Sequence, residues 1–254
     1  MTLLNSYSTK FTILYIMVMV NNLSQVNADY KSNGDLTHLT SYELTNNTKF
    51  EIKYLTTEGL AQPIRFLLNL MGRRFKDVRI TNATWKSGAK KEMPFGHVPV
   101  LILDDTIRLT QSTAICRFLA TFVHDQLNEV NDWEAYLIDS NVENMQDLRR
   151  ELIKHIHEIN DDKRNKLKAK FENITLPIFL RKFENIVTYN HQHFVRGKLT
   201  WADIFFASIA NSIGKLINNT SYLDKYHNLK KLTEKVLSIE AIQSWLENPE
   251  YIVV

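Results

Sequence analysis

Cysteine, glycine and proline are scarce in this sequence, which has one, seven and five of them in 254 residues. A single cysteine excludes an intramolecular disulfide framework. Few glycines and prolines, together with a hydrophobic content of 44%, are typical of a compact and largely helical globular protein. A chain of this length can form one large domain or two modest ones.

A strong charge of one sign is also missing. The 31 Lys and Arg residues nearly balance the 28 Asp and Glu residues, which leaves a formal net charge of +3 at pH 7. No cluster of Lys and Arg carries interleaved aromatic residues of the kind that bind nucleic acid. We therefore predict no nucleic-acid partner.

The apolar run near the N-terminus is short. Lys10 precedes the apolar segment Phe11–Val20, and a polar stretch then ends in Val26-Asn27-Ala28. A charged start, a short apolar core and a small residue at the cleavage point form the pattern of a secretory signal peptide. The segment is shorter than the roughly 20 residues that span a bilayer. We predict a signal peptide over residues 1–28 and a secreted protein; an uncleaved N-terminal anchor is the alternative.

Five Asn-x-Ser/Thr sequons follow the predicted signal peptide and give secretion weak support, because several arise by chance in an asparagine-rich chain. Asn46 lies in a polar segment and is the preferred glycosylation candidate. Asn82 and Asn218 are further candidates. Asn173 falls within a helical pattern, which disfavours its use.

The first predicted domain covers residues 49–124, after a polar and flexible N-terminal extension over residues 29–48. Its order of strand, helix, strand, two further strands and helix is typical of a thioredoxin-like α/β domain. The predicted strands are Phe50–Leu55, Phe75–Ile80, Pro99–Leu103 and Thr106–Leu109, with a hairpin turn at Asp104-Asp105.

The second predicted domain, residues 132–254, follows helical periodicity throughout and should be all-α. Its first helix carries a long apolar stripe formed by Trp133, Tyr136, Leu137, Val142, Met145, Leu148, Leu152 and Ile156. Its second helix, Lys163–Tyr189, should be kinked by Pro177 and should bury Leu167, Phe171, Ile174, Ile178, Phe179, Phe183 and Ile186.

A capping box opens the third predicted helix of this domain. Thr200 is the expected N-cap, and Asp203 should reach back to it. The nearly all-apolar stretch Ile204–Ile217 that follows must be central and buried. Two shorter helices, around residues 229–237 and 239–246, complete the chain.

Three places in the first domain carry polar groups that a buried core does not require. Tyr54 stands at a strand end, where its hydroxyl can donate to an anion such as a thiolate. Pro99 opens an apolar strand, and a cis bond there would turn the backbone of Val98 outward to pair with an extended peptide. Ser112, after Gln111, is an N-cap candidate at a helix N-terminus, which suits a carboxylate. These features predict a pocket for a small anionic peptide that bears a thiol.

The chain from about Lys49 onward resembles the cytosolic-type glutathione transferases, most closely the sigma class that includes the haematopoietic prostaglandin D synthases. The order of the motifs makes the resemblance specific. The matching pieces are Tyr54, Ala61-Gln62-Pro63-Ile64-Arg65, Asp77-Val78-Arg79-Ile80, Trp85, Met93-Pro94-Phe95-Gly96, Val98-Pro99-Val100-Leu101, Gln111-Ser112-Thr113-Ala114-Ile115 and Leu199-Thr200-Trp201-Ala202-Asp203.

The resemblance implies glutathione as co-substrate and Tyr54 as the donor that stabilises its thiolate. A free thiol has a pKa near 8.5 and is mostly protonated at neutral pH. By the same resemblance, Trp85 and Lys90 contact the glycine carboxylate of glutathione. Lys91 is the alternative to Lys90, because this loop is one residue longer than usual in the family.

The remaining contacts to glutathione follow from the resemblance too. His97 and Val98 pair with its cysteinyl backbone, ahead of Pro99, and Gln111 and Ser112 hold its γ-glutamyl carboxylate. The family is homodimeric, and Asp147, or Gln146 beside it, lies where the neighbouring subunit offers an acidic residue to the γ-glutamyl amine. An ordinary solvated position for Asp147 is the alternative.

One departure from the family follows Tyr54. Sigma-class chains read Arg-Gly-Arg where this chain reads Glu58-Gly59-Leu60. Leu60 cannot support a thiolate with positive charge, and a carboxylate at Glu58 would disfavour an anion. Two hypotheses therefore stand. The first is a secreted glutathione transferase acting on apolar electrophiles, hydroperoxides or a prostaglandin endoperoxide. The second is a non-catalytic binding or structural protein on the same fold.

Cysteine and histidine chemistry is not predicted. Cys116 lies within an apolar helical segment and is interpreted as a small core residue. Two histidine pairs, His155 with His157 and His191 with His193, have a spacing that does not place both rings on one helix face. We predict surface positions for all four and no metal site.

Overall fold

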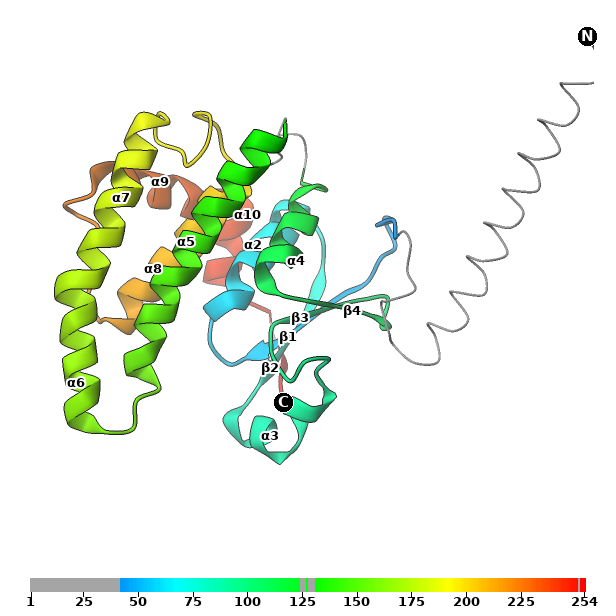
Figure 1. The fold of residues 1–254 in the computed structure, drawn as a ribbon. Coiled ribbons are helices and arrows are strands. Elements are labelled where there is room, and N and C mark those ends of the chain that lie inside the picture. The colour runs from blue at the N-terminus through cyan, green and yellow to red at the C-terminus, as the bar shows by residue number, and fades with distance from the viewer. Residues whose placement is uncertain (1–41, 124–126, 128–130, 251) are drawn as a thin grey trace, which may run out of the picture.

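A mixed sheet with the strand order β4-β3-β1-β2-β5 lies beside a group of long helices (Figure 1). The computed structural model describes residues 42–123, 127, 131–250 and 252–254. The predicted signal peptide and most of the residues between the two predicted domains lie outside these residues. None of the described helices is long and apolar enough to cross a membrane.

Four strands of the sheet were predicted to within one residue. β1 is Phe50–Leu55, β2 is Phe75–Ile80, β3 is Val100–Leu103 and β4 is Ile107–Thr110. β1 pairs in parallel with β2 and antiparallel with β3, which pairs antiparallel with β4. A fifth strand, β5 (Ile252–Val253), was not predicted and pairs in parallel with β2. The C-terminal segment therefore returns to the edge of the N-terminal sheet.

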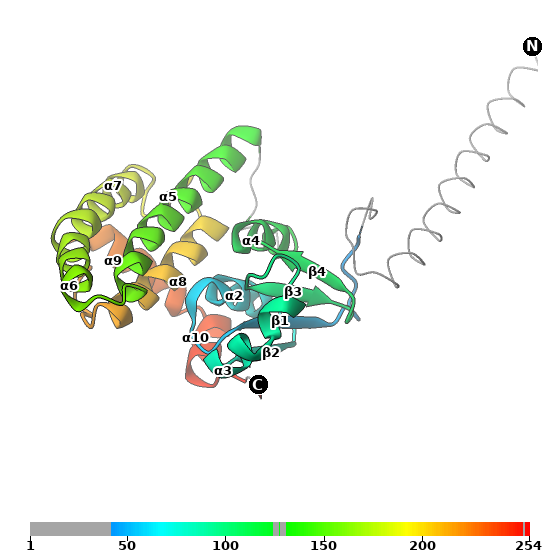
Figure 2. The same ribbon diagram turned by 60° about the horizontal axis from the view of Figure 1, so that its bottom comes forward.

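Alternation along the strands divides the sheet into two faces. Phe50, Ile52 and Tyr54 of β1 are buried on the face covered by α2 (Gln62–Leu70) and α4 (Ser112–Ala120). The opposite face carries a small cluster of Met93, Val100 and Ile102 beneath α3 (Asn82–Ser87) and η3 (Ala89–Glu92). Figure 2 shows α3 on the opposite side of the sheet from α4. This arrangement confirms the thioredoxin-like expectation.

The hairpin between β3 and β4 has the predicted turn. Asp104 and Asp105 both have positive φ angles, 48° and 62°, as a two-residue hairpin turn requires. The carboxylate of Asp104 accepts hydrogen bonds from the Tyr42 hydroxyl (2.7 Å) and the Lys49 amide (2.9 Å). The flexible extension was therefore predicted to end too late in the sequence, because Tyr42, within its last part, contacts this hairpin.

The helical part is built around one buried helix. Thr200 and Asp203 form the predicted capping box, and α8 (Trp201–Leu216) is buried along most of its length. Its neighbours include α5 (Asp132–Ile156), α9 (His227–Leu237) and α2. The other helices are α6 (Asp161–Lys170), α7 (Leu176–Tyr189) and α10 (Glu240–Glu247).

The predicted second helix is interrupted just before Pro177, the residue expected to disturb it. A π-helical turn, η4 (Phe171–Thr175), separates α6 from α7, and Pro177 lies just after it in the first turn of α7, where it has no N–H to donate into the preceding helical turn. The wider π-helical turn changes the direction of the side chains within it and after it. Ile174 and Ile178 are therefore exposed, at 54% and 44%, and not buried as predicted.

The ends of the apolar stripe on α5 were also assigned wrongly. Trp133, Tyr136 and Ile156 are exposed, whereas the middle of the stripe is buried. Trp133 and Tyr136 stack on each other with ring centroids 5.2 Å apart. Glu134 and His155, beside these exposed residues, are buried, so α5 packs near both ends but directs Trp133, Tyr136 and Ile156 away from its neighbours.

Two of the four histidines predicted at the surface are buried. His193 has its Nε2 atom 3.1 Å from Lys235 Nζ and its Nδ1 atom 3.5 Å from Asp203 Oδ2, so polar partners offset its burial. His155 packs beside the ring of Phe171. Spacing along a helix excludes a shared face but says nothing about the burial of each ring. Cys116 is fully buried as predicted, and burial raises the pKa of its thiol.

Candidate functional site

A cleft lies where β3 and β4 meet the start of α4. Its walls bring together five of the predicted site residues, His97, Val98, Pro99, Gln111 and Ser112. Leu60, discussed above for the positive charge that it lacks, also lines the cleft, together with Phe95 and Thr110, to which sequence reasoning gave no role. The cleft encloses about 60 Å³ and shares Leu60, Gln111 and Ser112 with a groove of about 830 Å³ between α4 and α5.

One wall of the cleft is formed by the segment that enters β3. The Val98–Pro99 peptide bond is cis, and buried Pro99 stands directly before the first strand residue, Val100. A residue without an N–H group is tolerated at that position, because the ladder of the sheet begins only afterwards. Exposed His97 precedes Val98 along the same wall.

The N-terminus of α4 forms the facing wall. Gln111 occupies the N-cap position with φ 69°, and Ser112 is the first helical residue. The predicted N-cap role of Ser112 was therefore wrong. The N-cap is Gln111, one residue earlier, which has an uncommon backbone conformation. The Gln111 side chain forms no capping hydrogen bond, so the first N–H groups of α4 can bind another acceptor.

Helix α5 completes this wall through Gln146. The Gln146 Nε2 atom donates to Ser112 Oγ at 3.2 Å and lies 3.4 Å from Thr113 Oγ1. Gln146 is buried, whereas Asp147 is exposed and forms an ion pair with Arg150. Of the two residues proposed for a contact to the γ-glutamyl group, Gln146 is the one that lines the adjoining groove and reaches Ser112 in its own chain.

Tyr54 lies behind the cleft and not on its surface. Its side chain is 5% exposed, and its hydroxyl accepts a hydrogen bond of 3.1 Å from the backbone N–H of Leu60. Because the hydroxyl accepts this bond, its own proton can point elsewhere. Leu60 faces the cleft, so the path from the cleft to the Tyr54 hydroxyl passes beside Leu60.

Buried charges support Tyr54 from the other side. The guanidinium of Arg65 lies 6.0 Å from the centre of the Tyr54 ring, within cation–π range. Arg65 Nε donates to Asp77 Oδ1 at 3.1 Å, and Asp77 Oδ2 accepts from Arg79 Nε at 2.9 Å. Burial lowers the pKa of Arg65, and the charge of Asp77 opposes that shift. Arg65 and Asp77 appear in the motifs quoted above, but spacing alone gave them no role.

Trp85 and Lys90 are two more predicted site residues that do not line the cleft. Trp85 packs against the small cluster around Met93, together with Val98. Lys90 is exposed, and its aliphatic stem runs beside Gly96. Their contacts to glutathione stay predictions from the family resemblance.

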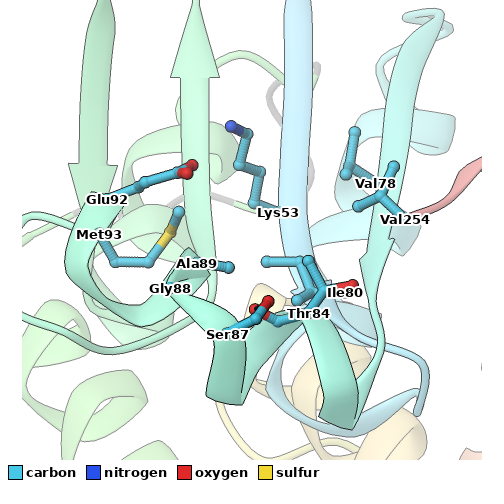
Figure 3. Close-up of a pocket in the computed structure, with 10 residues that line it drawn as sticks. All are labelled: Lys53, Val78, Ile80, Thr84, Ser87, Gly88, Ala89, Glu92, Met93 and Val254. Carbon is cyan, nitrogen blue, oxygen red and sulfur yellow. Dashed lines mark hydrogen bonds between the residues drawn. The ribbon is translucent and has the colours of Figure 1, made fainter.

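A second cavity, of about 200 Å³, lies between the sheet and α3 (Figure 3). Its lining is mostly apolar and includes Val78, Ile80 and Met93. Two charged residues reach it, Lys53 from β1 and Glu92 from η3. Lys53 also lies 3.7 Å from Glu51, so its charge is already partly balanced. Among the described residues, no group of three or more His, Cys, Asp or Glu side chains could hold a metal ion.

Comparisons with known proteins identify both parts of the chain. Residues 60–121 match the family described as "Glutathione S-transferase, N-terminal domain", and residues 146–249 match "Glutathione S-transferase, C-terminal domain". A "Glutathione S-transferase" of Anopheles gambiae is 34% identical over 197 residues, which cover 78% of this chain and 95% of that protein.

Two further comparisons concern prostaglandin synthases. A "Hematopoietic prostaglandin D synthase" of Gallus gallus is 27% identical over 78% of this chain and 95% of its own length. The solved structure of prostaglandin synthase D of Nilaparvata lugens is 31% identical and superimposes with a TM-score of 0.75, covering 80% of this chain and 100% of that one.

Proposed function

The chain belongs to the glutathione S-transferase family, and we propose that it is a secreted, sigma-like glutathione transferase that conjugates glutathione to small apolar electrophiles. The cleft is the observation that carries this proposal. It places the N-terminus of α4 opposite the backbone of Val98, and Leu60, whose N–H donates to the Tyr54 hydroxyl, lines the same cleft. The N-terminus of α4 can bind a carboxylate, the Val98 backbone can pair with a peptide backbone, and the Tyr54 hydroxyl can donate to a thiolate.

The proposed chemistry is a nucleophilic attack by sulfur. The thiol of bound glutathione loses its proton to solvent, and the Tyr54 hydroxyl donates a hydrogen bond to the thiolate. The sulfur electron pair then forms a bond to the electrophilic carbon, and the leaving group departs with the electron pair of its own bond. The backbone N–H of Leu60 supports the hydroxyl oxygen during this step, because it already donates to that atom.

For the substrate that accepts the glutathione thiolate, we propose only the chemical class. Hydroperoxides and a prostaglandin endoperoxide are candidates beside carbon electrophiles, and the names of the Gallus gallus and Nilaparvata lugens proteins support the endoperoxide. We also propose a homodimer, as is typical of the family, in which exposed Asp147 faces the neighbouring copy.

A non-catalytic binding protein is the second candidate. The observation in its favour is that the Tyr54 side chain is 5% exposed, while Leu60 stands where sigma-class chains have an arginine. On this hypothesis the cleft still binds glutathione, but the thiol keeps its ordinary pKa.

Two measurements on the mature protein distinguish the candidates. Calorimetry with glutathione tests the cleft, and conjugation of a generic aromatic electrophile tests the chemistry. Binding with conjugation that Tyr54→Phe removes supports the transferase. Binding without conjugation supports the second candidate, and the absence of glutathione binding contradicts both.

A further inference from the structure

Glu58 is held by helix α8 and not directed at the cleft. Its Oε1 atom lies 2.5 Å from Lys215 Nζ, and its Oε2 atom accepts hydrogen bonds from Ser212 Oγ at 3.3 Å and Asn211 Nδ2 at 3.4 Å. These partners lie more than 150 residues further along the chain. The carboxylate that the sequence suggested as an obstacle to an anion is thus neutralised by a lysine of the helical part.

The loop between β1 and α2 is held through both the backbone and the side chain of Glu58. The Glu58 carbonyl oxygen accepts from Arg65 Nη1 at 3.1 Å and from the Gln62 amide at 3.1 Å, while its carboxylate contacts α8. Glycine follows at position 59, and the next residue, Leu60, donates its N–H to the Tyr54 hydroxyl. The position of Leu60 therefore depends on contacts made two residues before it.

We propose that Glu58 and Lys215 form a latch between the two parts of the molecule and act as positioning residues for Tyr54. The latch holds the β1–α2 loop against α8 and thereby keeps the Leu60 N–H on the Tyr54 hydroxyl. This inference rests on the proposed transferase function for its catalytic consequence. The structural consequence, the position of Leu60, is independent of any activity.

The latch is of moderate strength. The Lys215 side chain is 58% exposed and that of Glu58 is 24% exposed, so solvent and salt screen their attraction. A contact of this strength can bias the position of a short loop without deciding whether the domain folds. Loss of the latch should therefore loosen the loop and leave the global unfolding transition nearly unchanged.

The test uses Glu58→Gln, Lys215→Met and the exchanged pair Glu58→Lys with Lys215→Glu. Amide hydrogen exchange of the segment that contains Leu60 is the first readout. We expect both single variants to exchange roughly two- to fivefold faster there, and the exchanged pair to recover most of the protection. Lys230→Met is the matched control, because Lys230 forms an exposed ion pair with Asp224 within the helical part.

The second readout is the pKa of the thiol of bound glutathione, from thiolate absorbance against pH. The single variants should raise it and lower kcat, while the glutathione Kd changes less than about twofold, since the latch touches no part of the cleft. Unchanged exchange at Leu60 in both single variants would overturn the latch, whatever the activity. Faster exchange with an unchanged thiol pKa would overturn its positioning role. A chain that binds no glutathione would contradict the proposed function, and exchange alone would then decide the latch.

Discussion

Gly59 and Tyr54 approach each other so closely that no side chain fits between them. A Cβ atom added to Gly59 would overlap the Tyr54 hydroxyl oxygen and lie 2.7 Å and 2.8 Å from two carbons of its ring. Gly59 also has a φ of +41°, which side-chain-bearing residues rarely adopt. The glycine is thus required twice, once for its own conformation and once for the place of the hydroxyl.

Replacing Gly59 with alanine should therefore impair catalysis more than stability. The methyl group must push the Tyr54 ring away, and a displacement of about 1 Å at a catalytic group can lower the rate by roughly 100-fold. The conformational strain should cost about 1 kcal/mol of unfolding free energy. Conjugation kinetics and urea unfolding measure the two effects separately.

Gly72→Ala is the matched control for that experiment. Gly72 also has a positive φ, +65°, but no atom lies within 4 Å of an added Cβ there. It should show a similar loss of stability and ordinary conjugation. Equal activity of both variants would contradict the close contact between Gly59 and Tyr54.

Ser112→Ala should weaken retention of the mature protein on immobilised glutathione. Ser112 Oγ lies in the cleft at the start of α4, where it can donate to the γ-glutamyl carboxylate while it accepts from Gln146. A charge-assisted bond of this kind contributes roughly 1.5–3 kcal/mol. Ser238→Ala is the control, because the Ser238 hydroxyl is exposed and bonds to Lys235 within its own turn. Retention of Ser112→Ala equal to that of the control would remove Ser112 from the site.

The strands and turns were predictable because their signals are local. The β1 alternation, the Asp104-Asp105 turn and the Thr200–Asp203 capping box each depend on residues a few positions apart. The β5 strand was missed, since its pairing with β2 joins the C-terminal segment to a strand far earlier in the chain. The same limit applies to His193, whose burial depends on Lys235 and Asp203.

The cleft was predictable in part. His97, Val98, Pro99, Gln111 and Ser112 were named from their motifs, and the structure brings them together. The covering of Tyr54 by Leu60 was not foreseen, because sequence says which residue follows the strand but not how the loop turns back. The contact from Gln146 of α5 to Ser112 could not be predicted either, since it depends on how the helical part packs against the N-terminal domain.

His155 should make the stability of the protein sensitive to acid. Burial lowers its pKa below the ordinary value near 6.5, the charge of Glu172 opposes this shift, and Lys168 adds to it. A lowered pKa means that the folded protein favours the neutral ring. The stability that this contributes is complete above pH about 6.5 and is lost as the pH falls through the lowered pKa.

The measurement is the urea-unfolding free energy from pH 7.5 to pH 5 in three proteins. His155→Gln should flatten its dependence on pH, whatever its effect at pH 7.5. His157→Gln should leave the dependence as it is, because His157 is exposed two residues away. A pH dependence that is the same in all three would show that His155 does not titrate differently on unfolding.

The secretion proposal predicts where the protein is found and how its mass changes on signal-peptide cleavage and on deglycosylation. Expressed in a secretory host, the chain should appear in the medium, cut near Ala28 and lighter after glycan removal. Asn82 and Asn218 are exposed. Arg73 donates to the backbone and side-chain oxygens of Asn46, so this contact does not engage the side-chain nitrogen that a glycan would modify. Substituting these three asparagines with glutamine should remove the change in mass on deglycosylation. Intact protein in the cytosol would contradict the signal peptide.

The last prediction concerns Leu60, which faces the cleft beside the Tyr54 hydroxyl. In the unmodified protein, the Tyr54 hydroxyl, which accepts from the Leu60 N–H, is the proposed donor to the thiolate, and Leu60 adds no charge beside it. We therefore expect the thiol of bound glutathione to keep a pKa nearer its solution value than in sigma-class relatives. Leu60→Arg adds a cation, and an opposite charge within ~4–6 Å commonly shifts a group by 1–3 pKa units toward its charged form.

Leu60→Arg should lower the thiol pKa and raise conjugation at neutral pH, while glutathione affinity changes less, because the added attraction acts on developing charge and not on the peptide backbone. Leu60→Met is the control for side-chain length without charge. Tyr54→Phe in the Leu60→Arg background should abolish the gain, since it removes the direct donor to sulfur. Thiolate absorbance against pH decides the question. If the unmodified chain already shows a strongly depressed thiol pKa, another group supplies the missing charge, and buried Arg65 beneath the Tyr54 ring is the cation placed to do so.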